Sequence, residues 1–587
     1  MHGWHGKGLD IDLTTGSIEE ITPKKELYLR YLGGRGLGVR MVFDQTGPET
    51  DPLGPENIIV FAAGPFTGSN IPTSGRFSAV SRSPLTGTMF DCNCGGRFGV
   101  QMKLGGWDFI VVRGKSPKPV FIALEKGKVT IEDAGEVWGL NVRDVTAKLG
   151  GRGSVLTIGK AGERQVLLSG VVNDIDHSLA RGGFGAIMGA KNLKALVAKG
   201  HLGRLEPVHP RLYEKYYQDI TRLLTSSPVS SKGLTIYGTS VLMNLINYMK
   251  ILPTDNFRKT TFAKAEEISG EKMHAVYNVK SKACYSCPIV CRKEEKETTI
   301  PLPEYETLAM FGSNLNNIDL KSIVEANELC NEYGLDSISV GTTLSCHAEI
   351  EGRDLTPEEI VELVREIGEN EGIGKELGQG SHRYALARNA SHTAMEVKGL
   401  ELPGYDPRGV LGQALGYATS NRGGCHLRAY LVGLEILGKP KLINRLSFDG
   451  KSGLVALFQN IAATVDSLIA CKFSKFSVSE EEYANILSAL TGEDFPSQSL
   501  IDIGERTWNL ERLYNLKAGI GIESDTLPER FFNEDGSGTA KKIDHDAFMH
   551  SLHEYYHFRG WDENGVPSPE QLKGMGLEPD GRDLNVA

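Results

Sequence analysis

The feature that most constrains this chain is a run of three cysteines, Cys284, Cys287 and Cys291, spaced as Cys-x2-Cys-x3-Cys. Three thiols so close in the sequence cannot all pair as disulfides. Their spacing suits three corners of an iron–sulfur cube, which usually takes four cysteine ligands, so the fourth must come from elsewhere. Zinc is an alternative, although it usually takes paired Cys-x2-Cys knuckles or a histidine pair. Simple burial of the cysteines is the other alternative.

The size and charge of the chain narrow the class of protein. At 587 residues it exceeds what one hydrophobic core usually serves, so two to four domains are expected. The net charge of −10 argues against nucleic acid as a partner. The sequence has neither a stretch of 18 apolar residues nor an N-terminal signal pattern, so we predict a cytoplasmic protein without a membrane span.

Residues 1–205 are predicted to form a β-rich domain. Short β-prone runs bounded by glycine or proline recur there, and a Lys-Gly turn predicts one hairpin. The predicted strands cover residues 58–63, 109–112, 120–124, 128–131, 155–158, 166–168 and 195–197.

Beyond residue 205 the hydrophobic period becomes helical. Thr356-Pro357-Glu358-Glu359 is a capping box with proline at the first helical position. A second helix is predicted to open at Ser479 and end at Gly492, and a third to cover residues 322–333 and stop at Gly334. We therefore predict an α+β fold, in which two mainly helical domains, 206–395 and 396–587, follow the β-rich one.

Glycine is in excess, at 69 of 587 residues, and it gathers in short clusters. Four clusters of the N-terminal domain combine glycine with polar or basic side chains, at residues 33–38, 73–78, 91–97 and 180–186. Free backbone N–H groups beside a guanidinium make an anion site, because arginine pairs with phosphate through two hydrogen bonds. A single cluster is more often a tight turn, but four in one domain favour a large phosphorylated cofactor.

The sequence also resembles a known family. Residues 180–194, Ala-Arg-Gly-Gly-Phe-Gly-Ala-Ile-Met-Gly-Ala-Lys-Asn-Leu-Lys, are similar to a hallmark of the tungsten-dependent aldehyde:ferredoxin oxidoreductases. Gly-Arg-Phe-Ser at 75–78, the cysteine run and Asn-Arg-Gly-Gly-Cys-His at 421–426 resemble the same family in the same order. The resemblance covers essentially the whole chain. It implies a tungsten atom held by two pterins, whose phosphates a magnesium ion bridges; molybdenum could take the place of tungsten.

The resemblance also implies roles for individual residues. Two segments, 331–336 and 466–471, are similar to the family's pterin-binding motifs, although Asn331 and Ile469 replace the usual aspartate and glycine. Cys471, in the second segment, becomes the fourth ligand of a [4Fe–4S] cluster. The phosphates and magnesium are assigned to Arg76, Asn93, Gly95, Arg181 and Gly182, and the pterin rings to Gly334, Asp336, Arg428 and Asp466.

Two further residues are predicted to carry the chemistry. Glu304 and Glu306 stand among apolar neighbours, where a carboxylate gains a raised pKa and can act as a general base. The resemblance favours Glu306 as the base and His426 as a hydrogen-bond donor to the substrate carbonyl. The implied reaction oxidises a small aldehyde to a carboxylic acid and sends the electrons through the cluster to ferredoxin or a ferredoxin-like subunit.

Two other functions stay open from the sequence: a catalytic subunit like that of tungsten benzoyl-CoA reductase, and a non-catalytic iron–sulfur electron-transfer subunit. A homodimer is also expected. Some relatives hold a metal between subunits through a Glu-x-x-His pattern, but here Glu325 is followed by Glu328 where histidine would stand.

Overall fold

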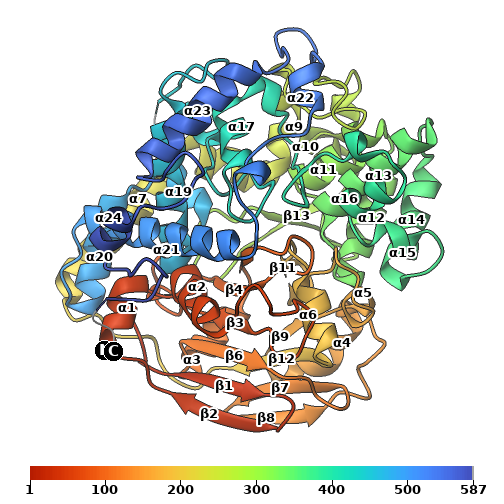
Figure 1. Ribbon diagram of the computed structural model, residues 1–587. Coiled ribbons are helices and arrows are strands. Elements are labelled where there is room, and N and C mark those ends of the chain that lie inside the picture. Colours follow the sequence, from red (N-terminus) through yellow and green to blue (C-terminus); the bar gives the residue numbers. More distant parts are fainter. Residues whose placement is uncertain (440, 585–587) are drawn as a thin grey trace.

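The computed structural model describes residues 1–439 and 441–584. Its N-terminal part contains two six-stranded sheets, drawn red to orange beneath the helices in Figure 1. The first sheet has the order β2(Ser17–Ile21), β1(Gly8–Asp12), β6(Phe109–Arg113), β3(Ile59–Ala62), β4(Phe77–Arg82), β5(Met89–Cys94). The second has the order β11(His177–Leu179), β10(Val171–Asn173), β9(Ser154–Thr157), β12(Leu193–Lys199), β7(Val120–Glu125), β8(Lys128–Asp133). Only the β1–β6 and β12–β7 pairs are parallel within these sheets.

The alternation of side chains along the strands explains how the sheets pack. Ile59 and Phe61 of β3 share one core cluster with Ile122 and Leu196 of the second sheet. Val60, the residue between them, belongs to a second cluster on the opposite face. Successive residues of a strand point to opposite faces, so the two sheets face each other across the first cluster.

Most predicted strands are confirmed, and one is wrong. Residues 166–168 form turns after the short helix α5(Lys160–Glu163) and pair with no strand. The run Val-Leu-Leu is buried, but its backbone forms hydrogen bonds with Gly378 and Asp336 rather than with another strand.

The predicted helix ends agree with the structure, but the helix predicted over residues 322–333 begins two residues earlier, at Leu320. Thr356 and Glu359 form the capping box of α14(Pro357–Glu369), and Ser479 and Glu482 form that of α20(Glu480–Thr491). Gly492 and Gly334 end their helices in the left-handed conformation. The other long helices are α2(Gly34–Gln45), α7(Pro210–Ser226), α12(Leu320–Tyr333), α13(Ser337–Glu351), α19(Lys451–Leu468), α21(Ser497–Lys517) and α23(His545–Phe558).

The β-rich part and the helical part share their cores. The first cluster continues from the sheets into α11(Tyr305–Phe311) and α12, and the second joins the outer face of the first sheet to α2, α19 and α21. Figure 1 shows α2 between the first sheet and the blue C-terminal helices. The α+β fold class is confirmed, while the boundaries at residues 205 and 395 stay predictions. No helix within the described ranges is both long and apolar enough to cross a membrane.

Candidate active site

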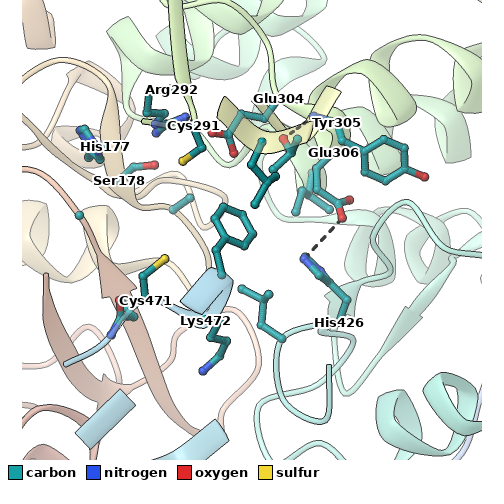
Figure 2. A pocket seen from close by; sticks show the side chains of 18 of the residues that line it. His177, Ser178, Cys291, Arg292, Glu304, Tyr305, Glu306, His426, Cys471 and Lys472 are labelled. Carbon is teal, nitrogen blue, oxygen red and sulfur yellow. Dashed lines mark hydrogen bonds and ion pairs between the residues drawn. The ribbon is translucent and has the colours of Figure 1, made fainter. Parts of the chain in front are cut away.

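One cavity of about 520 Å³ gathers most of the predicted site residues. Its walls come from the sheets, from α11 and from the loops around α19. Figure 2 shows Cys291 and Cys471 on one side of it and the Glu306–His426 pair on the other. The predicted residues that line it are Arg76, Asn93, Gly95, Arg181, Cys284, Cys287, Cys291, Glu306, Asp336, His426, Arg428, Asp466 and Cys471.

The cysteine run forms the loop of a small hairpin. Strands β13(Val279–Lys282) and β14(Arg292–Glu295) pair antiparallel, and residues 283–291 connect them. Ser286 and Val290 both have a φ of 52°, so the chain coils tightly between the cysteines. Such a loop turns three thiols of one short segment toward the same cavity.

Thr73 ties this loop to Cys471. The backbone N–H of Thr73 donates to the carbonyl of Ser286, and its carbonyl accepts from the N–H of Cys471, both at 3.1 Å. Thr73 has a φ of 70° and is buried. One residue of the N-terminal domain thus fixes the distance between the cysteine run and the predicted fourth ligand.

The four thiols lie close enough to influence one another. Burial raises the pKa of Cys287 to about 12, and the neighbouring Cys471 adds to that effect. Burial also raises the pKa of Cys291, as do Glu304 and the other three cysteines. In the described part of the chain, no three His, Cys, Asp or Glu side chains converge to hold a single metal ion.

His177 is a neighbour of the cysteines that sequence reasoning missed. Its Nε2 lies 3.1 Å from Cys284 Sγ, and its Nδ1 lies 2.9 Å from Asp176 Oδ1. Burial alone would raise the pKa of Cys284, but the hydrogen bond and the charge of His177, together with Arg76 and the Gly96 N–H, outweigh it and lower the pKa to about 6. No local motif marks His177, because β10 and β11 bring it to a loop more than 100 residues away.

Arg76 and Gly95 lie at the cysteine side of the cavity. Arg76 donates to the side chain of Asn93 and, at 3.0 Å, to its backbone carbonyl. Thiolates of Cys471 and Cys284 favour the charged form of Arg76 and, against the effect of burial, raise its pKa. A Cβ at Gly95 would come within 2.9 Å of Cys284 Sγ, so only glycine fits there. Their assignment to pterin phosphates stays a prediction.

Arg181 and Asp336 form hydrogen bonds with each other and with backbone groups of the protein. Arg181 donates to Asp336 Oδ2 at 3.1 Å and to the carbonyls of Gly424 and Glu401 at 2.7 and 2.6 Å. Asp336 also caps α13 by accepting two backbone N–H bonds. These bonds hold both side chains rigidly at the cavity wall. Gly182 and Gly334 are not among the residues that line the cavity.

A buried charge network surrounds Arg428 and Asp466. Arg428 Nη1 lies 2.6 Å from Asp91 Oδ1 and 3.5 Å from Asp466 Oδ2, and Arg35 pairs with both carboxylates. Burial would raise the pKa of Asp91, but Arg35 and Arg428 lower it. Asp91 is the first residue of the glycine cluster at 91–97. Its place in that cluster was the only feature of the sequence that indicated a role for Asp91.

The glycine cluster at 33–38 does not reach the cavity. It forms the start of α2, and Arg35 makes two hydrogen bonds of 2.7 Å to Glu511. A Cβ at Gly34 would come within 2.3 Å of the backbone carbonyl of Asp466, so glycine permits close packing of α2 against α19. This segment therefore serves the packing of α2, and a role for it in binding the cofactor stays a prediction.

Two helices end in the same way beside the cavity. Gly334 ends α12 and Ile469 ends α19, both in the left-handed region, and Asp336 and Cys471 each follow two residues later. Ile469 is completely buried and has a φ of 65°. This conformation costs a residue with a Cβ about 1–2 kcal/mol, which explains why glycine is usual at this position of the motif.

We predict an unusual order of stability at position 469. Ile469→Ala lowers the melting temperature, because truncating a buried isoleucine costs about 2–5 kcal/mol. Ile469→Gly lowers it less, because glycine releases the backbone strain. At Leu468, whose conformation is helical, the order reverses and alanine is the milder change. Thermal unfolding followed by circular dichroism measures all four variants, and a milder alanine at both positions contradicts the strain at Ile469.

Glu306 and His426 face each other at the other side of the cavity. Glu306, in the first turn of α11, accepts a hydrogen bond of 2.7 Å from the Gly404 N–H at Oε2. Its Oε1 lies 3.5 Å from His426 Nε2. The rings of Tyr405 and Tyr430 lie near the imidazole, with centroids 5.6 and 6.3 Å away from it. Glu304 instead pairs with Arg292 at 2.9 Å, so the structure distinguishes the two carboxylates.

The surroundings shift the pKa values of Glu306 and His426 in opposite directions. Burial raises the pKa of Glu306 to about 8, although the Gly404 N–H and Arg181 oppose it. Burial and then the nearby arginines lower the pKa of His426 to about 3. The imidazole is therefore neutral across the physiological range, and the carboxyl group exchanges its proton near neutral pH.

Comparisons with known proteins agree with this arrangement. Residues 8–200 match the family described as aldehyde ferredoxin oxidoreductase, N-terminal domain, and residues 215–577 match its domains 2 and 3. The chain belongs to the aldehyde ferredoxin oxidoreductase family. The family resemblance predicted from the motifs is thereby confirmed.

Individual relatives carry the comparison further. The tungsten-containing aldehyde ferredoxin oxidoreductase of Pyrococcus horikoshii is 40% identical over 98% of this chain and 100% of its own. The enzyme of the same name from Pyrococcus furiosus is 39% identical over 98% and 99%. Among solved structures, the active-site complex BamBC of benzoyl coenzyme A reductase, bound to 1,5-dienoyl-CoA, superposes with a TM-score of 0.84. At 22% identity over 98% of this chain and 97% of that one, this likeness shows a shared fold.

Proposed function

We propose that this protein oxidises an aldehyde to the carboxylic acid at a tungsten–pterin centre and passes the two electrons through a [4Fe–4S] cluster to ferredoxin. The observation that carries the proposal is one cavity with the Glu306–His426 pair on one side and four cysteines on the other. Cys284, Cys287, Cys291 and Cys471 are the proposed cluster ligands. The relatives of about 40% identity, which are tungsten-containing aldehyde ferredoxin oxidoreductases, support the same reaction.

The cavity fits an anionic cofactor. Within the described residues, Arg422 Nε, Arg428 Nε and Thr73 Oγ1 are buried without a hydrogen-bond partner, although all three side chains line the cavity. Buried polar atoms of this kind normally have partners, so these three atoms fit a bound group that accepts hydrogen bonds. Arg76 and Arg181 would hold its phosphates with magnesium, and Asp336, Arg428 and Asp466 its pterin rings. When bound, this group supplies the two-electron redox chemistry.

The side chains of this protein manage the substrate and the proton. Oxidation of an aldehyde with water yields the acid, two protons and two electrons. His426, neutral at working pH, donates an N–H hydrogen bond to the carbonyl oxygen of the aldehyde. This bond increases the partial positive charge on the carbonyl carbon. Glu306 Oε1, which has no hydrogen-bond partner among the described residues, takes the proton of the attacking water. Apolar side chains of Leu242, Leu245 and Phe476 also line the cavity and favour an uncharged aldehyde.

Metal analysis and an aldehyde assay test this function. Anaerobically purified protein is expected to contain one tungsten and about four irons per chain, as a single cubane requires. It is expected to reduce ferredoxin with phenylacetaldehyde far faster than with the charged glyceraldehyde 3-phosphate. Iron without tungsten in an active preparation, or zinc alone, would contradict the proposal. Reduction of benzoyl-CoA without aldehyde oxidation would favour the ring-reductase alternative.

The homodimer stays a prediction that light scattering of the same sample tests.

The pKa of Glu306 predicts the pH dependence of the reaction. A general base must be ionised, so kcat/KM is expected to rise with pH through an inflection near 8 and then level off. His426, with a pKa of about 3, adds no inflection above pH 5. A profile of kcat/KM between pH 5 and 10 measures this. A fall in kcat/KM as pH rises through 8 would contradict the role of Glu306 as a base.

A further inference from the structure

A buried Asp–His pair contacts the sulfur of one proposed cluster ligand. His177 Nε2 lies 3.1 Å from Cys284 Sγ, and Asp176 Oδ1 lies 2.9 Å from His177 Nδ1. Asp176 and His177 are 5% and 6% exposed. The chemistry proposed above uses neither residue, so their burial beside the cysteine requires another reason.

The hairpin that carries this pair is fastened to both sides of the cysteine loop. Asp176 Oδ2 lies 3.0 Å from the Nζ of Lys282, the last residue of β13. The backbone carbonyl of Asp176 accepts a hydrogen bond from Arg292, the first residue of β14. The imidazole and the cysteine loop therefore keep a fixed relative position.

The backbone turn that places His177 beside Cys284 is strained. Asp174 and Ile175, in the turn before the pair, have φ values of 49° and 89°, and a β-branched residue rarely adopts the second. Asp174 stabilises the turn by accepting hydrogen bonds of 2.9 Å from the Val155 N–H and 2.7 Å from the Ser154 hydroxyl. On the other side, a Cβ at Gly95 would come within 2.8 Å of the His177 ring. Strain of this kind persists where a specific placement is required.

We propose that His177, oriented by Asp176, donates a hydrogen bond to Cys284 Sγ and thereby raises the reduction potential of the cluster. This inference rests on the cluster in the proposed function. Asp176 accepts a hydrogen bond from Nδ1–H, and an iron-bound thiolate can only accept one from Nε2–H. A donor at the sulfur stabilises the reduced cluster, which carries the additional negative charge. His177 is thus a positioning and tuning residue of the electron path.

Redox titration of the anaerobic holoenzyme, followed by the EPR signal of the reduced cluster, tests this role. His177→Phe removes the donor and is expected to shift the midpoint potential to a lower value. His177→Gln retains a neutral N–H donor and is expected to give an intermediate potential. His347→Phe is the control, because His347 is equally buried and bonds Tyr384 instead of a cysteine. The midpoint potential of the cluster in His347→Phe is expected to equal that of the unaltered protein.

The outcomes separate this inference from the proposed function. An intact cluster with an unchanged potential in His177→Phe would overturn the inference alone. If this variant loses its cluster, pulsed EPR of the unaltered protein with 15N-labelled histidine decides. A histidine nitrogen coupled to the reduced cluster is expected, and its absence overturns the hydrogen bond. Unaltered protein without a four-iron cluster would overturn the proposed function as well.

Discussion

Replacing Cys471 by alanine is expected to abolish the iron–sulfur cluster. Three cysteines remain in the hairpin loop, but a [4Fe–4S] cluster usually takes four ligands, and Thr73 holds Cys471 opposite that loop. We expect iron to fall from about four atoms per chain to near zero or to a degraded cluster. Ferredoxin-dependent turnover is then lost. Iron analysis and the EPR spectrum of reduced protein measure the change.

Cys346→Ala provides the matched control for Cys471. Cys346 is fully buried in α13, and its Sγ contacts the Thr393 hydroxyl at 3.1 Å, away from the cavity. Its replacement removes a buried thiol without removing a proposed ligand, so iron content and turnover are expected to persist. An unchanged cluster spectrum in Cys471→Ala would remove Cys471 from the ligand set.

Replacing Glu306 by glutamine is expected to remove most of the activity while leaving the metals bound. General bases contribute about 10²–10⁴-fold to rates, so kcat should fall by a factor in this range. The amide is nearly the same size and can still accept the hydrogen bond from the Gly404 N–H. Tungsten and iron contents are expected to match the unaltered protein. Steady-state kinetics with metal analysis on the same samples measures both effects.

The same variant has a predicted effect on stability. The folded-state pKa of Glu306 is raised, so the folded protein holds this proton more tightly than the unfolded chain. The resulting stabilisation is complete below the unfolded pKa and disappears as pH rises through 8. The melting temperature of Glu306→Gln relative to the unaltered protein should therefore increase between pH 5 and 9. Glu304→Gln, at a partly exposed residue paired with Arg292, should show neither effect. Full activity in Glu306→Gln would exclude this residue as the base.

Local signals in the sequence predicted much of this molecule. Capping boxes located α14 and α20, because a cap depends on residues within one turn. The spacing of Cys284, Cys287 and Cys291 likewise predicted a shared site within one loop. Family motifs, rather than spacing, indicated Cys471, Glu306 and His426, which come from distant segments. Their placement in one cavity required the folded structure.

Other features could not be predicted because they depend on tertiary contacts. His177 reaches Cys284 only through the pairing of β10 and β11 and the position of that hairpin beside another. Arg35 stands in a glycine-rich segment typical of an anion site, yet Glu511, far along the chain, binds it. Residues 166–168 have the composition of a strand but no partner strand. In each case a contact from a remote segment decides the outcome.

The bridge that Thr73 makes between Ser286 and Cys471 also constrains how the protein is made. The three residues are contributed by the first eighth, the middle and the last quarter of the chain. A nascent chain that has not yet reached residue 471 presents at most three of the proposed cluster ligands, and one that has not reached residue 466 also lacks Asp466 at the cavity wall. With the proposed ligands, cofactor insertion is expected to follow the synthesis of most of the polypeptide. Any factor that delivers iron or tungsten would need to recognise a nearly complete apoprotein rather than a chain emerging from the ribosome.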